Sequence, residues 1–304
     1  MSSARVAPVY LPFAGAEFGL RMGLMPLPEE DWLELDENLN EALARKRALL
    51  ETRHDEAFQA LPEAAAASRE LLDLLAAHLC RYHAALFRSE GSRLLNRATG
   101  EEWDLEAPAL HPLDVAGYLV AEDFCLLQAA GDRYVLTGAT LCSPARWRLA
   151  EKLGAPLTAI HDSVPGYATT LARPVDHFFA ALKANRLVCR FNWGIVDDPR
   201  PFQPVAPPPR RDITADNAGE CLWLRVERQT LRRLPATSAV VFAISTHITC
   251  LDRAVVRPQQ ALALAAAIRA MPAEMQRYKQ IAPHAATLLA WLDRLVQRKP
   301  PEDC

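Results

Sequence analysis

The stretch EDFCLLQAAGDRYVLTGATL, residues 122–141, decides the fold that we expect for this chain. Two strand-like runs flank a Gly-Asp pair, which is typical of two antiparallel strands joined by a tight turn. Three further strand-like runs follow at residues 186–196, 220–234 and 237–249. Because each later strand can join through a hairpin or a short loop, the sequence predicts an antiparallel sheet of five strands.

Helical patterns lie before, between and after these strands. Residues 28–53 begin with proline and acids and end with bases, the charge order that complements a helix dipole. Residues 63–88 repeat this pattern and carry leucines on one side, namely Leu71, Leu72, Leu75 and Leu79. Shorter helices are expected at residues 143–154 and 175–185, and the chain is expected to be helical from residue 257 to its end.

These elements predict an α+β fold in a single domain, residues 1–304. The N-terminal helical layer would occupy residues 1–90, the sheet and a ligand pocket residues 91–250, and the C-terminal helices residues 251–304. Two strands, a helical connector and three strands form the strand order of a PAS domain, in which the connector walls one side of a ligand pocket. The proline-rich run at residues 198–211 is expected to be a long surface loop.

Composition excludes several classes of protein. The 304 residues are 50% apolar and 23% charged, with a net charge of −3, so no basic field indicates nucleic acid or an anionic membrane as a partner. The first 15 residues lack the apolar core of a signal peptide, and no apolar run reaches about 18 residues. We therefore expect a cytoplasmic protein without a membrane span.

The cysteines and the absent motifs narrow the chemistry further. Seven cysteines are scattered singly without C-x-x-C, which argues against a disulfide framework, structural zinc or a cysteine-ligated iron–sulfur cluster on this chain. The sequence has no G-x-G-x-x-G, no G-x-x-x-x-G-K-[ST], no G-x-S-x-G and no H-E-x-x-H. It therefore shows no standard nucleotide-binding, serine-hydrolase or zincin signature.

One histidine stands out in the stretch AEKLGAPLTAIHDSVPGY, residues 150–167. Pro156 and Pro165 stiffen the chain on both sides of His161, and Gly166 permits a tight turn. A neutral imidazole on such a loop can ligate a metal while its other ring nitrogen is held by a carbonyl. The alternative is a loop histidine with an ordinary hydrogen bond, and the pattern leaves both open.

Two strand-like runs carry polar side chains in alternation. In CRFNWGI, residues 189–195, Arg190 and Asn192 share one face, and in LRVERQTLRRLP, residues 224–235, Arg225, Glu227 and Gln229 share one face while Val226, Arg228 and Thr230 share the other. These charges could lie on a solvated edge. Because the sheet is otherwise apolar, some of them are expected to face a pocket, where an arginine can pair with a carboxylate.

Together these stretches resemble the alpha-subunit-like family of haem-dependent oxidative N-demethylases. The resemblance runs from residues near 20 to near 250, through the segments RMGLMPL, GYLVAEDFCLL, SPARWRLAEKLGAPLTAIHDSVPGY, CRFNWGI and LRVERQTLRRLPATSAVVFAI. It implies a PAS-type sheet holding haem b with a histidine axial ligand and an open position for O2. The family reaction demethylates dimethylamine to methylamine and formaldehyde. Its electrons come from a separate NADPH-dependent reductase that carries FMN and a [2Fe–2S] cluster.

The resemblance also implies roles for individual residues. His161 would be the axial ligand of the iron, and Arg190, Asn192 and Arg225 would bind the cofactor through its propionates or orient substrate. Glu227 and Arg228 would be catalytic, the first by holding a cationic amine and the second by donating a hydrogen bond to iron-bound oxygen.

The chain departs from the family pattern at two places. The family more often has proline at the position of Ser163, and Arg-Thr-Tyr at positions 245–247, where this chain has Ser, Thr and His. The amine specificity is therefore open, and His247 is a rival ligand. Two other readings also stay open: a non-catalytic haem-binding or small-molecule-binding PAS-like sensor, and a structural protein without a cofactor.

Overall fold

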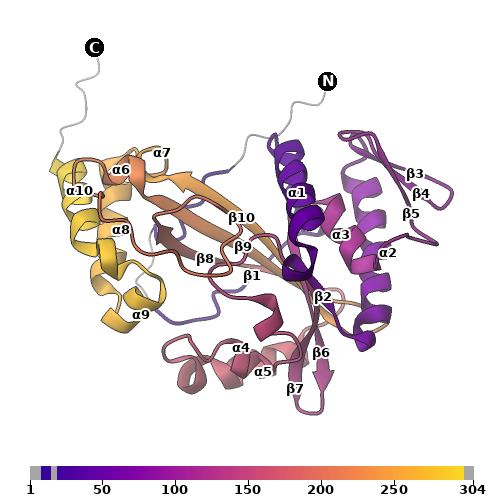
Figure 1. Ribbon diagram of the computed structural model, residues 1–304. Coiled ribbons are helices and arrows are strands. Elements are labelled where there is room, and N and C mark those ends of the chain that lie inside the picture. Colours follow the sequence, from indigo (N-terminus) through magenta and orange to yellow (C-terminus); the bar gives the residue numbers. More distant parts are fainter. Residues whose placement is uncertain (1–7, 15–18, 298–304) are drawn as a thin grey trace.

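The computed structural model describes residues 8–14 and 19–297, and its largest element is a seven-stranded sheet in which every neighbouring pair is antiparallel (Figure 1). The strand order is β1-β8-β9-β10-β6-β7-β2. The strands are β1 Met25–Pro26, β2 Phe58–Ala60, β6 Asp123–Ala130, β7 Arg133–Thr140, β8 Leu187–Val196, β9 Trp223–Arg233 and β10 Val240–Cys250.

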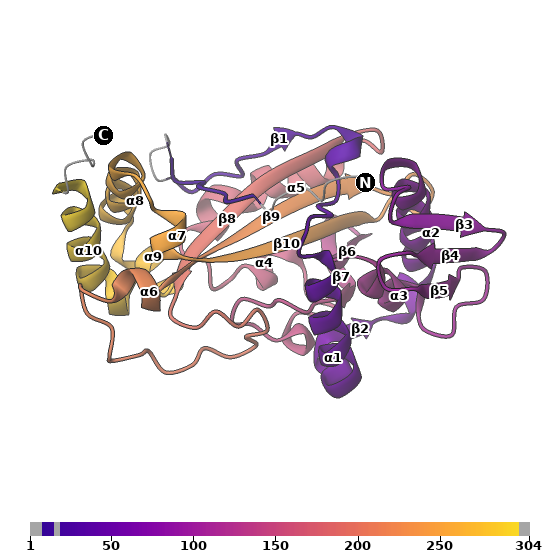
Figure 2. The ribbon, with the colours of Figure 1, turned by 90° about the horizontal axis from the view of Figure 1, so that it is seen from above.

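All five predicted strands form, as β6 to β10, and they lie side by side. The first hairpin turns at Gly131, whose φ of +64° is a left-handed conformation that glycine adopts without strain. The predicted number of five strands was wrong, because two more strands join the sheet at its edges: β2 pairs with β7, and β1 pairs with β8. Figure 2 shows β1 along the outer side of β8. Strands of two and three residues are too short to show a period in the sequence.

The helices surround this sheet, and a second, three-stranded sheet lies beside α2 (Figure 1). The second sheet consists of β3 Phe87–Glu90, β4 Arg93–Asn96 and β5 Glu101–Asp104. The helices are α1 Leu39–Ala57, α2 Ala65–Tyr82, α3 Pro112–Leu119, α4 Leu157–Ile160, α5 Ala172–Ala181, α6 Ala218–Cys221, α7 Leu251–Ala254, α8 Pro258–Ala270, α9 Ala273–Tyr278 and α10 Ala285–Gln297.

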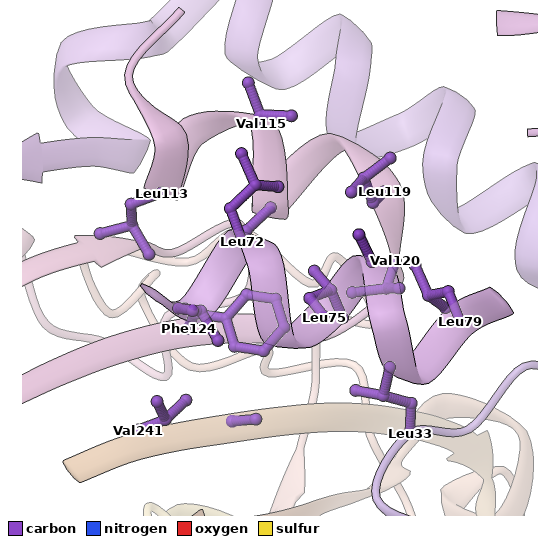
Figure 3. Close-up of a cluster of buried hydrophobic side chains, with 14 of the residues drawn as sticks. Leu33, Leu72, Leu75, Leu79, Leu113, Val115, Leu119, Val120, Phe124 and Val241 are labelled. Atoms are coloured by element: carbon purple, nitrogen blue, oxygen red, sulfur yellow. The ribbon is translucent and has the colours of Figure 1, made fainter. Parts of the chain in front are cut away.

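We call face A the side of the large sheet that carries Phe124 and Leu126 of β6 and Val241 of β10. Helices α2 and α3 pack on it and bury a cluster of apolar side chains, which Figure 3 shows. The predicted leucine side of α2 is confirmed, since the four leucines expected on it, Leu71, Leu72, Leu75 and Leu79, are fully buried. Burying one such side chain stabilises the fold by about 1.5–3 kcal/mol.

The predicted helix at residues 28–53 begins later than expected, at Leu39. Residues 32–38 instead form an irregular segment, in which Trp32 is 0% exposed. The guanidinium of Arg228 donates to the carbonyl oxygens of Asp31 and Trp32. In a helix, each of these carbonyls would accept a hydrogen bond from the backbone N–H four residues further along the chain. Here the side chain of Arg228 takes the place of those bonds.

The opposite side, which we call face B, carries Leu231 and Val240 and is covered by α4 and α5. The predicted helix at residues 143–154 is also wrong, because only the 3-10 turn Leu149–Glu151 forms there. Arg146 has a φ of +64° and is engaged elsewhere: its N–H donates to the carbonyl oxygen of Gln203 and its side chain lies 3.4 Å from Asp197. These distant contacts override the local helical pattern.

The C-terminal helices α8 and α10 pack over Leu224 and Val226 at the far end of face A. The predicted helical C-terminus is confirmed as far as residue 297. Its last residues, 298–304, which include Cys304, lie outside the described residues, as do residues 1–7 and 15–18 near the N-terminus. Within the described part of the chain, no helix combines the length and apolar character needed to cross a membrane.

Candidate cofactor and substrate site

A polar patch lies on face B, next to the apolar area beneath α4 and α5. Asn192, Glu227 and Thr246 form one row across β8, β9 and β10, since Glu227 is the register partner of both others. Arg190 and Gln229 form the neighbouring row. Paired residues of antiparallel strands point to the same side. The alternation predicted for β8 and β9 is therefore confirmed, and Arg190, Asn192, Arg225, Glu227 and Gln229 share one face.

Glu227 is the centre of this patch. Its Oε2 accepts hydrogen bonds from Nδ2 of Asn192 at 3.3 Å and from Nε2 of Gln229 at 2.9 Å. Its Oε1 lies 3.4 Å from Nε of Arg225. Three donors from two strands thus hold the carboxylate in place. One of them, Arg225, also brings a positive charge next to its negative charge.

Arg225 and Arg190 differ in how their donors are used. Arg225 is 5% exposed, and its other two nitrogens donate to the carbonyl oxygens of Ser143 at 2.6 Å and Pro201 at 3.2 Å. It therefore ties the connecting segment and the proline-rich loop to the sheet. In contrast, Nε of Arg190 is buried and has no hydrogen-bond partner among residues 8–14 and 19–297.

The surroundings of Arg190 act on its positive charge in opposite directions. Burial lowers the pKa of this guanidinium, whereas Glu227 acts in the opposite direction, as do the hydroxyls of Tyr278 and Tyr167. Leaving a buried donor without a partner costs about 1–3 kcal/mol. An anionic group on face B would satisfy this donor, and a carboxylate matches the guanidinium best.

His161 follows α4 and is held by one hydrogen bond. Its Nδ1 lies 2.8 Å from the carbonyl oxygen of Leu157. Because a carbonyl only accepts, Nδ1 carries the proton and Nε2 keeps its lone pair. Burial lowers the pKa of His161, although the bond to Leu157 acts in the other direction, so the ring is neutral at physiological pH. A neutral ring with a fixed tautomer is the form that binds metals.

Tyr167 packs directly on this histidine. The two rings are stacked, with centroids 4.5 Å apart and an angle of 11° between their planes. Gly166, with a φ of +76°, precedes a π-helical turn, Tyr167–Leu171, which leads into α5. Burial raises the pKa of Tyr167 to about 12, and its hydroxyl has no hydrogen-bond partner within the described chain. Single π-turns of this kind are frequent at functional sites.

A cavity of about 230 Å³ opens beside His161. Its lining comes from residues 158–169, including Val164, Pro165 and Tyr167. Pockets that hold small molecules and cofactors usually measure about 300–1,000 Å³. The cavity beside His161 is therefore smaller than the pockets that usually hold a large cofactor.

Lys279 completes the polar patch from a distant part of the chain. It directly follows α9, and its Nζ donates to Oδ1 of Asn192 at 3.0 Å and to the carbonyl oxygen of Trp193 at 2.6 Å. Burial lowers the pKa of its ammonium to about 8, although Glu227 acts in the other direction. Sequence reasoning missed Lys279, because no local pattern links it to β8.

Arg228 and His247 lie on face A, on the other side of the sheet from this patch. Arg228 binds the carbonyl oxygens of Asp31 and Trp32, and Nε2 of His247 lies 2.9 Å from Oε2 of Glu34. The structure therefore brings Arg190, Asn192, Arg225 and Glu227 together on face B, and His161 belongs to the layer that covers this face. It does not bring Arg228 or the rival ligand His247 to them.

These residues offer the donor types that a metal-bearing cofactor with carboxylate groups requires. His161 offers a free nitrogen lone pair, and Arg190 offers an unpaired cationic donor. In a comparison with models of protein families, the family described as haem-dependent oxidative N-demethylase, alpha subunit-like, matches residues 23–289. The match spans most of the chain, including both sheets and the polar patch.

Proposed function

The chain belongs to the haem-dependent oxidative N-demethylase, alpha subunit-like family, and we propose that it binds haem b on face B and oxidises a small secondary amine of the dimethylamine type. The reaction would consume O2, two electrons and two protons, and would convert dimethylamine into methylamine, formaldehyde and water. The five strands β6 to β10, with α4 and α5 on face B, would form the PAS-like core of the site.

The single observation that carries this proposal is the state of His161. Its Nδ1 is fixed by the carbonyl of Leu157, which leaves Nε2 free to serve as axial ligand. The patch offers a matching group for the same cofactor, since haem carries two propionates and the buried Nε of Arg190, which lacks a partner, would pair with one of them. Bound haem would supply the oxidation of the methyl group, while the chain orients the amine and excludes water.

The cofactor-binding residues would divide this work. Arg190 would pair with a propionate. Arg225 and Asn192 would position other side chains of the patch. Arg225 would hold Glu227, and Asn192 would link Glu227 to Lys279. Tyr167 would hold the plane of the His161 ring by stacking on it.

Glu227 would hold the ammonium form of the substrate. It is a half-buried carboxylate, and its hydrogen-bond donors leave lone pairs for an N–H of the amine. We leave Arg228 out of the reacting site, because its guanidinium is buried on face A against residues 31–34. Its proposed part is to fix that segment to the sheet.

A partner would supply the electrons. The proposal includes a separate reductase with FMN, a [2Fe–2S] cluster and NADPH, since the sequence shows neither a dinucleotide fingerprint nor grouped cysteines. The words alpha subunit-like in the family description support an assembly of several chains.

The proposal is tested by the absorption spectrum of the haem-loaded protein during titration with dimethylamine. We expect a shift of the Soret band in the wild type. In Glu227→Gln we expect half-saturation at roughly 10–100-fold higher amine, because a hydrogen bond to a charged group is lost. Glu220→Gln, an exposed residue of α6, is the matched control and should behave as the wild type. Haem binding without any amine response would favour the sensor module instead.

A further inference from the structure

We propose that Gln229 favours ammonium ions with two N–H bonds, such as a protonated secondary amine, by accepting the second N–H while Glu227 accepts the first. This inference rests on the proposed function, and it assigns the choice between secondary and tertiary amines to one residue. The observation behind it is a buried acceptor: Gln229 is 7% exposed, and its Oε1 has no hydrogen-bond partner in the described part of the chain.

The orientation of the Gln229 amide follows from its neighbour. Its Nε2 lies 2.9 Å from Oε2 of Glu227. An ionised carboxylate only accepts hydrogen bonds, so the NH2 group of Gln229 must point at Glu227 and its oxygen must point elsewhere. The amide of Asn192 is fixed in the same way, with Nδ2 on Glu227 and Oδ1 on Lys279. Unlike Asn192, however, Gln229 is left with an unused oxygen.

The surrounding residues do not satisfy this oxygen. Across β10 the register partner of Gln229 is Ile244, which has no polar side-chain atom. Across β8 the partner is Arg190, whose Nε is itself unpaired. In the next row, the buried hydroxyl oxygen of Thr246 also lacks a partner beside Glu227. Buried polar atoms without partners are uncommon in folded proteins, so the Gln229 oxygen, which only accepts, indicates a ligand with a hydrogen-bond donor, whereas the Thr246 hydroxyl can accept or donate.

The number of donors distinguishes small ammonium ions. A dimethylammonium ion has two N–H bonds, and in this proposal it donates one to Glu227 and the other to Gln229. A trimethylammonium ion has one, which the charged Glu227 would take. Binding dimethylammonium would thus satisfy the buried oxygen of Gln229, and binding trimethylammonium would leave it unpaired.

Titration calorimetry of the full-length, haem-loaded protein with dimethylammonium chloride and with trimethylammonium chloride tests this role. The readout is the ratio of the two dissociation constants, trimethylammonium over dimethylammonium. Gln229→Leu also removes a donor from Glu227, but that loss weakens both ions alike and cancels in the ratio. We expect Gln229→Leu to lower the ratio roughly tenfold, the size of one hydrogen bond to a charged donor.

Two further variants keep the test decisive. Gln229→Met has nearly the volume of glutamine and should give the same fall in the ratio if Gln229→Leu does not fold. Thr230→Val changes the next residue, which is buried on face A, and should leave the ratio unchanged. A wild-type ratio retained in Gln229→Met would overturn the inference, as would a wild type that does not prefer dimethylammonium.

The failure of this inference can be separated from the failure of the proposed function. The Soret absorbance of the same samples reports haem content. A wild type that does not retain haem contradicts the proposed function, whereas an unchanged ratio in haem-loaded protein contradicts only the role of Gln229.

Discussion

Arg228 and Glu34 form a buried ion pair on face A, with 3.7 Å between Nε of the arginine and Oε1 of the glutamate. Tyr10 and His247 also bind this carboxylate. Burial alone would raise the pKa of Glu34, but the hydrogen bond from His247 and the charge of Arg228 hold it below its ordinary value. The cluster fastens residues 31–34 across the strands whose other side carries the proposed site.

Loss of the Arg228 side chain should therefore destabilise the fold without removing the haem ligand. Arg228→Met leaves Glu34 buried without its arginine, which costs about 3–5 kcal/mol when one partner of a buried pair is removed. Urea unfolding monitored by circular dichroism measures this loss, and Arg211→Ala, at an exposed position, is the control. A variant of wild-type stability, or a stable variant that has lost haem affinity, would contradict this account of Arg228.

Glu122 predicts a dependence of stability on pH. It is 1% exposed, and burial raises its pKa to about 7 although its Oε1 accepts the N–H of Glu34 at 2.8 Å. A carboxyl with a raised folded-state pKa holds its proton more tightly when folded. Its contribution is complete below the unfolded pKa, near 4.5, and is lost as the pH rises toward 7.

The variant Glu122→Gln removes this titration. The difference in unfolding free energy between Glu122→Gln and the wild type should shift in favour of the variant by up to about 3 kcal/mol between pH 4.5 and pH 8. Urea unfolding at several pH values measures it. Parallel pH profiles of the two proteins would show that Glu122 does not titrate in this range.

The two arginines of the patch should respond differently to replacement by glutamine. Arg190→Gln removes an unpaired donor, so we expect roughly tenfold weaker haem binding with little change in stability. Arg225→Gln breaks bonds to the carbonyls of Ser143 and Pro201 and should lower the free energy of unfolding by about 1–3 kcal/mol. Haem titration and urea unfolding of both variants separate the two roles, and the reverse pattern would contradict them.

The sequence predicted those features of the site that depend on neighbouring residues in one strand, and it did not predict those that depend on contacts between distant parts of the chain. Alternation along each strand correctly grouped Arg190 with Asn192, and Arg225 with Glu227 and Gln229, because a strand has a period of two wherever it pairs. Only the register between β8 and β9 shows that the two groups share one face of the sheet. The same alternation put Arg228 on the other face. The resemblance nevertheless assigned it a role beside the iron, and only the contacts with residues 31–34 show what occupies its guanidinium.

The remaining features arise from contacts that have no local pattern. Lys279 reaches Asn192 from 87 residues away, and Arg146 leaves its expected helix for contacts with Gln203 and Asp197. The edge strands β1 and β2 are formed by pairing alone. Tertiary contacts decide each of these cases, which helix propensity and hydrophobic period do not capture.

Haem binding should change the segment that covers the site. Because the cavity beside His161 measures about 230 Å³, less than cofactor pockets usually do, we predict that residues 157–171 rearrange when haem binds. Hydrogen exchange followed by mass spectrometry should show altered protection of these residues on haem addition, with α10 as an unaffected reference. Unchanged exchange across residues 157–171 in protein that has bound haem would place the cofactor elsewhere.

The most direct test of the account is a haem titration of the wild type beside His161→Ala. The control is His177→Ala, which removes an exposed histidine of α5. We predict that the wild type and His177→Ala bind one haem with the same Soret band, and that His161→Ala loses this band or binds haem far more weakly. Unchanged haem content and spectrum in His161→Ala would contradict the assignment of His161 as the ligand.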